Sequence, residues 1–518
     1  MSTSYIYFMQ FIEGKNRTQS ILFPESLDQI IDQNNEVRMI DLFVDSINPQ
    51  DFKFIMKTSI EGRPSYDPKD LLKLFVYGYL NQIRSSRALE KECKRNIELM
   101  WLMKQLAPDH NTISNFRRDN EKAIRQVFRY TVSIAKQFEL IGGKLIAGDS
   151  TKLRSQNSKK NNFNARKIER HLAYIDNKLA EYNAEIELAD QENKLVIQKQ
   201  IQKQNDRKKQ YHALTAELES TGEVQISTSD PDSRQLITRN NITEVAYNVQ
   251  TVVDAKHNLP IDYKVTNEND SKAMGGMLRR TKVILNTTDF TALYDKGYHT
   301  GSEIKKAIEL GIHIMVAVPD VASNAPDTAY NVANFKYDYT ADCYTCLQGK
   351  ILFTNGKWYN KDRGKSSVKV KHYKTPACMI CPVKDACTKN NRGRLIERTE
   401  HAPYIEQNQN NIDANRTLYK KRQAIVEHPY GILKRQWGFY YIMTKRGKKR
   451  ASADVGLMFI AYNLRRMMNI LDKNIFKKFL KELGFLFFGK LIDANENALT
   501  RALPIFEVSK SNLFLRAA

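Results

Sequence analysis

The segment KLIAGDSTKLR, residues 144–154, decides the expected fold, because it contains an apolar run that ends at Asp149. A second run of β-forming residues, in TALYDKGYHTG at residues 291–301, ends at Asp295. Both runs predict buried strands, so each carboxylate is expected at the mouth of a strand. An Asp after a strand is more often a turn or cap residue than a ligand, so neither stretch alone predicts chemistry.

A third carboxylate lies in a charged helical stretch, IVEHPYGILKRQWGF at residues 425–439. Glu427 is followed seven residues later by Lys434, which two helical turns would place on the same face. Three carboxylates on rigid elements can clamp two divalent cations about 4 Å apart and direct in-line attack on a phosphodiester. Their hard oxygens predict two Mg²⁺ or Mn²⁺ ions per site. We therefore expect Asp149, Asp295 and Glu427 to converge, with carboxyl carbons within about 8 Å of one another.

The composition indicates a polyanionic partner. Among 518 residues, Lys and Arg number 81 against 58 Asp and Glu, a formal net charge of +23. This excess is the electrostatic footprint of a nucleic-acid-binding protein. The apolar stretch at residues 6–12 is too short for a transmembrane helix and lacks the basic lead of a signal peptide, so no membrane partner is expected.

Five of the six cysteines fall between residues 343 and 387, and without an export signal they are expected as thiols rather than disulfides. Cys343 and Cys346 form one CxxC pair, Cys378 and Cys381 form a second, and Cys387 follows. Paired CxxC units on either side of a loop are typical of a zinc ribbon, in which thiolate coordination replaces a hydrophobic core. Four ligands suffice, and the spacing leaves open whether Cys343 or Cys387 is the surplus thiol.

From Leu22 to about Phe138 the sequence shows helical spacing almost throughout. One helix is expected to begin at Asp67 and Pro68, a cap followed by proline in the first turn. A later helix carries Arg117 and Arg118, which we expect on its exposed side. Two helices joined by a short turn, with basic residues on the second, are typical of a helix-turn-helix, and a plain helical bundle with a solvated basic face fits the spacing equally well.

The motifs GDSTK and YDKGY, together with the series Tyr419, Arg422, Glu427 and Lys434, resemble the three blocks of the DDE transposases of bacterial insertion sequences. The resemblance runs from about residue 20 to about residue 470. It departs from the family at one point, because the family places the Arg four residues before the Glu and Arg422 lies five before Glu427. Five residues are about 140° on an ideal helix, which would turn Arg422 away from the Glu427 face unless Pro429 kinks the helix.

The resemblance implies an α/β fold, with a ribonuclease H-like mixed-sheet catalytic core and an all-α N-terminal domain that binds the element's ends. It implies that Tyr419, Arg422 and Lys434 contact backbone phosphate near the cut. It also selects Cys346 as the zinc ligand that completes the CxxCPxxxxC segment, so the implied set for one structural Zn²⁺ is Cys346, Cys378, Cys381 and Cys387.

The implied activity is DNA transposition: cleavage at the ends of the protein's own mobile element and transfer of the 3′ ends to target DNA. The implied partner is double-stranded DNA, bound by a homodimer, and the implied location is the bacterial cytoplasm at the nucleoid. Two other functions stay open. One is a non-catalytic DNA-binding protein derived from a transposase, and the other is a nuclease of the same fold that does not join strands.

The long separations between the three acids predict two insertions in the catalytic domain. Apolar residues in alternating steps of four and three, from Ile168 to Ile186, predict a coiled-coil hairpin. The cysteine segment carries short β-forming runs in which Lys and Tyr interleave, which suits a DNA-contacting flap as well as solvated edge strands. The expected division is a helical domain at 1–138, a catalytic domain at 139–320 and 401–475, a coiled coil at 158–222, a cysteine-rich β insertion at 321–400 and a tail at 476–518.

Overall fold

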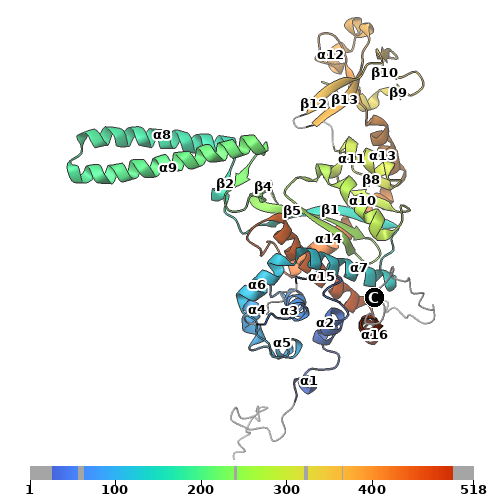
Figure 1. Cartoon of the computed structure of the whole chain (residues 1–518). Coiled ribbons are helices and arrows are strands. Elements are labelled where there is room, and N and C mark those ends of the chain that lie inside the picture. The colour runs from blue at the N-terminus through green and yellow to red at the C-terminus, as the bar shows by residue number, and fades with distance from the viewer. Residues whose placement is uncertain (1–25, 56–63, 239–241, 320–324, 364–365, 494–518) are drawn as a thin grey trace, which may run out of the picture.

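The computed structural model describes residues 26–55, 64–238, 242–319, 325–363 and 366–493 (Figure 1). The stretch at residues 6–12 and the tail beyond residue 493 lie outside this part. Figure 1 shows helices of the N-terminal part on one side of a central sheet, a long helical arm beside the sheet, and the cysteine segment beyond its other side. No helix in the described ranges is both long enough and apolar enough to span a membrane.

The central sheet is mixed, as expected for the catalytic core. Its order is β4-β5-β1-β7-β8, and β6 also pairs with β5. Strands β4, β5, β6 and β1 are joined by antiparallel pairs, whereas β7 runs parallel to β1 and β8 parallel to β7. The strands are β1 (Leu145–Arg154), β4 (Arg234–Ile237), β5 (Thr243–Asp254), β6 (Leu259–Thr266), β7 (Thr291–Tyr294) and β8 (His313–Val316).

The first strand is longer than the sequence indicates. Its apolar half ends at Asp149, but β1 continues to Arg154 because the twelve-residue strand β5 pairs with it over its whole polar half. Asp149 therefore lies in the middle of a strand, opposite Thr251, and the expectation of a strand end is wrong. The expectation is correct for Asp295, which directly follows β7.

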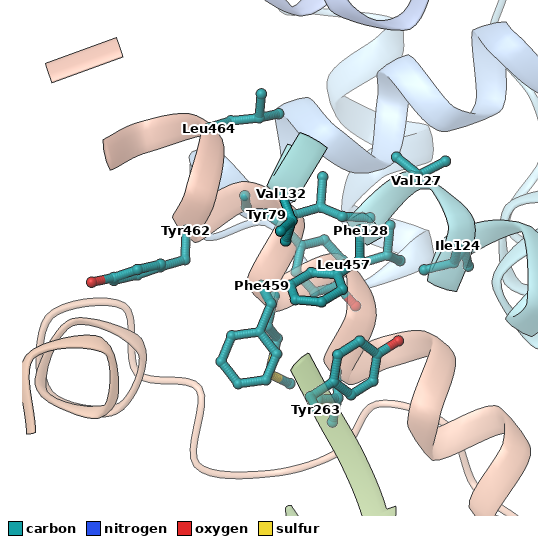
Figure 2. Close-up of a cluster of buried hydrophobic side chains, with 14 of the residues drawn as sticks. Tyr79, Ile124, Val127, Phe128, Val132, Tyr263, Leu457, Phe459, Tyr462 and Leu464 are labelled. Atoms are coloured by element: carbon teal, nitrogen blue, oxygen red, sulfur yellow. The ribbon is translucent and has the colours of Figure 1, made fainter. Parts of the chain in front are cut away.

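The largest core lies between the sheet and the N-terminal helices. Helix α15 (Lys448–Ile470) is buried along most of its length and packs against α7 (Glu121–Gln137) and β6. In Figure 2 the rings of Phe128, Tyr263 and Phe459 pack together. The ring centroid of Tyr263 lies 5.0 Å from that of Phe128 and 5.6 Å from that of Phe459. Such aromatic pairs stabilise a core by about 0.5–1.5 kcal/mol beyond their buried area. The helical N-terminal part and the sheet therefore share one core.

The N-terminal helices correct one predicted DNA contact. Arg117 is buried at 3% exposure, and its guanidinium contacts the Tyr79 hydroxyl at 3.1 Å and Asp454 of α15 at 3.5 Å. Arg84 contacts the other oxygen of Asp454 at 2.8 Å. Arg117 lies inside because α6 buries Ile113, Phe116 and Arg117, which share one helical face. The helices are α1 (Leu27–Ile30), α2 (Glu36–Asp45), α3 (Pro68–Leu80), α4 (Ser86–Cys93), α5 (Ile97–Leu102) and α6 (His110–Asp119).

Two long helices form the arm seen in Figure 1, α8 (Ala165–Leu188) and α9 (Gln191–Thr221), packed side by side. Apolar contacts gather at its base, where Ile168 and Leu218 are buried, whereas Leu188 at the tip is exposed. At 1.5 Å per residue, α8 is about 36 Å long. Short strands β2 (Asn162–Phe163) and β3 (Ile226–Ser227) pair where the arm joins the rest of the chain.

The cysteine segment is built from two small three-stranded sheets around its own apolar cluster, which includes Phe335, Tyr344 and Tyr373. Helix α16 (Lys473–Asp493) returns to the N-terminal part, where Phe476 and Phe479 pack on the ring of Phe138. The strands of the segment are β9 (Lys336–Asp338), β10 (Cys343–Thr345), β11 (Ile351–Phe353), β12 (Tyr359–Arg363), β13 (Ser366–Tyr373) and β14 (Ile396–Thr399).

Candidate active site

Two of the predicted carboxylates are positioned by neighbouring parallel strands, Asp149 within β1 and Asp295 directly after β7. Ala147 of β1 pairs with Leu293 of β7, and the same register two residues further on places Asp149 beside Asp295. Gly148 makes this arrangement possible, because a Cβ at that position would lie 2.0 Å from the ring of Tyr294. The glycine of the GDS motif therefore lets the ring before Asp295 pack directly on the backbone before Asp149.

The side chain of Asp149 is mostly shielded from solvent, with 22% of its surface exposed. The pKa of its carboxyl is raised to about 6, mainly by burial and with smaller contributions from the charges of Asp295 and Asp270, while the Ser150 N–H and Arg422 oppose the rise. Asp295 accepts a hydrogen bond from the Gly297 N–H at 2.9 Å, and caps the short helix η4 (Lys296–Tyr298). Carboxylates that gather away from water repel one another, so this edge of the sheet favours a bound cation.

Helix α14 (Arg416–Tyr430) lies across the two strands and contributes one face to the site. Tyr419 donates a hydrogen bond to the carbonyl of Tyr294 at 3.0 Å, and Tyr430 donates one to the carbonyl of Asp149 at 3.2 Å. Between them, the guanidinium of Arg422 lies 3.4 Å from the Asp149 carboxylate. The five-residue spacing thus turns Arg422 toward Asp149 rather than toward Glu427, as the helical angle predicts.

Glu427 lies on the flank of α14 and is exposed. Its carboxylate accepts a hydrogen bond from Gln423 at 2.9 Å, one turn earlier on the same side of the helix. Within the described ranges, no three His, Cys, Asp or Glu side chains are gathered tightly enough to hold a metal ion. The structure thus brings Asp149 and Asp295 together. Glu427 does not complete a three-carboxylate metal site with them in this conformation.

The helix changes its winding before it reaches Lys434. Residues Gly431–Gln436 form a π-helix, with a hydrogen bond from the Trp437 N–H to the Ile432 carbonyl, five residues back. Pro429, which lacks an N–H, lies just before this change. The expectation that two regular α-turns separate Glu427 from Lys434 is therefore wrong. The Lys434 ammonium instead donates to the Lys152 carbonyl of β1 at 3.0 Å.

Sequence reasoning missed a further carboxylate at the site, that of Asp270. It begins the short helix η3 (Asp270–Lys272) after β6, and its charge contributes to the raised pKa of Asp149. A single Asp in the polar stretch TNENDSK at 266–272 carries no spacing signal that separates it from a turn residue. Only the pairing of β5 with β1 brings it to the site.

The four cysteines implied by the resemblance lie in the same part of the segment, but within the described ranges no three of them are close enough together to hold a metal ion. Burial raises the pKa of the Cys387 thiol, and the neighbouring thiols of Cys346, Cys378 and Cys381 raise it further. The Lys350 N–H donates to the sulfur of Cys346 at 3.3 Å, as an amide does toward a thiolate. Cys343 is buried in strand β10. Cys93 is also buried, as an ordinary core thiol.

Two stretches of the chain match known domain families. Residues 25–119 match the family described as "Transposase domain (DUF772)", and residues 345–468 match the "Transposase DDE domain" family. The second stretch includes Glu427 and all four cysteines of the implied zinc set, whereas Asp149 and Asp295 lie between the two matches.

Comparison with solved structures includes a piggyBac transposase synaptic complex with hairpin DNA, at 9% identity and a TM-score of 0.27. The match covers 89% of this chain and 82% of that one. A similarity of this size does not establish a common fold. No curated protein matches the chain.

Proposed function

We propose a specific activity for this chain, whose matches to two transposase domains support a DDE transposase of an insertion sequence. It binds the ends of its mobile element, cleaves them by metal-dependent phosphodiester hydrolysis and transfers the 3′ ends to target DNA, as a homodimer on DNA. The single observation that carries the proposal is the placement of Asp149 on β1 and of Asp295 at the end of the adjacent parallel strand β7, with Arg422 against Asp149.

The carboxylates fit divalent cations. The raised pKa of Asp149 has its cause in burial and in two neighbouring acids, an imbalance that a hard divalent cation would correct. We assign Asp149, Asp295 and Glu427 as ligands of two Mg²⁺ or Mn²⁺ ions. Bound there, such ions would supply Lewis-acid activation of the phosphodiester and of the attacking oxygen. Glu427, exposed on α14, is in our proposal the ligand that approaches the scissile strand.

We propose that the basic side chains around the acids bind phosphates of the DNA backbone. In our proposal Arg422 leaves Asp149 and turns to a phosphate beside the cut, and Lys434 binds a second phosphate. Tyr419 holds α14 on the end of β7 through its bond to Tyr294, which keeps Arg422 over the site. Arg118, whose side chain is 41% exposed, is in our proposal a contact of the N-terminal helices with DNA. Arg117 has no such role, because it is buried.

We further propose that Cys346, Cys378, Cys381 and Cys387 hold one structural Zn²⁺. The fit is supported by the proximity of the three other thiols to Cys387 and by the amide hydrogen bond to Cys346. The segment's own apolar cluster is small, and a tetrahedral thiolate site would add the stability that it lacks. Cys343, packed in β10, is in this assignment the spare thiol.

One experiment separates the three candidate functions. Purified full-length protein is incubated with Mg²⁺ and linear DNA that carries both ends of its element, and the products are resolved by size and sequenced. A transposase yields both cleaved ends and joined product. A nuclease of the same fold yields cleavage alone, and a non-catalytic binder shifts the DNA without cutting it. Either of the last two outcomes would overturn the proposal.

A further inference from the structure

The carboxylate of Asp270 shares a small space with that of Asp295. A Cβ built on Gly297 would lie 3.1 Å from Asp295 Oδ1 and 3.7 Å from Asp270 Oδ2. Gly297 has no side chain, so the position between the two carboxylate oxygens is left clear. The carboxylates of Asp270 and Asp295, which come from different segments, therefore both lie next to Gly297 at the end of β7.

Asp270 is held in place by buried amides. Its Oδ1 accepts hydrogen bonds from Asn248 at 2.7 Å and from Gln250 at 2.6 Å. Both amides come from the middle of β5 and are fully buried, and the Tyr298 hydroxyl donates to Gln250 in turn. Burying amides inside a sheet is unfavourable unless they are bonded, and Asn248 Oδ1 still lacks a partner within the described ranges. Aligning one carboxylate so firmly is typical of groups that support a metal site.

The other oxygen of Asp270 already faces a cation. The Lys152 ammonium lies 3.3 Å from Asp270 Oδ2 and 3.0 Å from the Ser150 hydroxyl. Lys152 is partly exposed, at 28% of its side chain, so its flexible end can leave for solvent. This ammonium is a positive charge on the same Asp270 oxygen that lies nearest to Gly297.

We propose that Asp270 is a fourth carboxylate ligand of the active site, that it shares a divalent cation with Asp295 across Gly297, and that the Lys152 ammonium stands in for this ion in the free protein. The inference rests on the proposed function, because the ion is one of those assigned to Asp149 and Asp295. The competing explanation is that Asp270 only neutralises Lys152. The two explanations differ in what the loss of Lys152 does to metal binding.

The test measures Mn²⁺ binding by the full-length protein without DNA, by isothermal titration calorimetry and by the loss of the free Mn²⁺ electron paramagnetic resonance signal. Asp270→Asn is expected to weaken Mn²⁺ binding about tenfold or more. Lys152→Met is expected to tighten it several-fold, because a competing cation is removed. Asp254→Asn is the matched control, since Asp254 is a fully buried carboxylate held by backbone N–H groups of Gly142 and Gly143 at the far end of β5.

The outcomes distinguish this inference from the proposed function. Unchanged Mn²⁺ affinity in Asp270→Asn, with Asp149→Asn still weakened, would overturn the fourth ligand and leave the transposase proposal standing. Unchanged affinity in both variants would count against the metal assignment as a whole. If Asp270→Asn does not fold, Lys152→Met decides alone, because weaker or unchanged Mn²⁺ binding in that variant contradicts the stand-in role.

Discussion

The guanidinium of Arg422 lies 3.4 Å from the carboxylate of Asp149, although 273 residues separate them in the chain. The contact joins helix α14 to the middle of strand β1. It places a cation beside the carboxyl of Asp149, whose pKa is raised to about 6, mainly by burial. Arg422 is therefore positioned to neutralise Asp149 in the free protein. When a metal ion neutralises Asp149 instead, the guanidinium becomes available to bind a DNA phosphate.

Replacing Asp149 with Ala is expected to abolish end cleavage while DNA affinity stays within several-fold of wild type. Affinity for DNA comes mostly from phosphate contacts by Lys and Arg, which the substitution leaves in place. Gel-shift titration and a cleavage assay on the same preparation measure the two effects. Asp289→Ala is the control, because Asp289 is exposed and pairs with Lys144 at the surface. Equal loss of binding and cleavage would indicate a structural role for Asp149.

Asp149 should also leave a signature in the pH dependence of stability without metal. Its folded-state pKa, about 6, lies above the ordinary value of 3.8, so the folded protein binds the proton more tightly than the unfolded chain. The stabilisation is fully present below pH 3.8 and is lost as pH rises through about 6, a change of up to about 3 kcal/mol. Urea titrations from pH 4 to pH 7 should show this loss in wild type relative to Asp149→Asn. Parallel profiles for the two proteins would contradict the raised pKa.

The sequence predicted the parts of the site that depend on local pattern. Apolar runs located the two strands and placed Asp295 at a strand end, and the helical angle predicted that Arg422 turns away from Glu427. It could not predict that β5 would extend β1 beyond Asp149, because strand length here depends on pairing across the chain. Nor could it predict that Asp270 reaches the site from another segment. Element type is encoded locally, whereas convergence of distant side chains depends on tertiary packing.

Tertiary packing also decides the position of Arg117. The sequence predicted an exposed side chain, whereas in the structure it is buried against Asp454. Arg117→Ala is expected to lower the free energy of unfolding by about 3 kcal/mol, since it leaves a fully buried Asp454 with Arg84 as its remaining cationic partner. Chemical denaturation followed by circular dichroism measures the loss. The neighbouring substitution Arg118→Ala is the control and should change stability by less than about 0.5 kcal/mol, because that side chain is exposed. Equal stability of the two variants would contradict the buried ion pair.

The cysteine segment is expected to bind one equivalent of zinc in protein purified under reducing conditions, measured by elemental analysis. Cys381→Ser should reduce the zinc content to near zero and loosen the segment toward proteolysis, because the metal supplies part of its stability. Cys343→Ser is the matched control, since this buried thiol is outside the proposed set and should leave the zinc in place. If Cys343→Ser loses zinc and Cys387→Ser retains it, Cys343 is the fourth ligand in place of Cys387. The assignment of a zinc site to this segment would still hold.

Lys434 permits a choice between two roles, because its ammonium bonds to the carbonyl of Lys152 beside the site. If it grips a phosphate that flanks the cut, Lys434→Ala should stay folded and bind metal normally, while end cleavage falls and the salt dependence of DNA binding becomes shallower by about one phosphate contact. If it instead supports the acids or the π-turn, the variant should melt at a lower temperature and bind metal more weakly. We expect the first result, because bound metal ions would already neutralise Glu427 and the resemblance to the transposases ties this lysine to the DNA backbone. Lys434→Arg, which keeps the charge, should restore most of the salt slope. An unchanged slope in Lys434→Ala, together with a lowered melting temperature, would assign the lysine to structure.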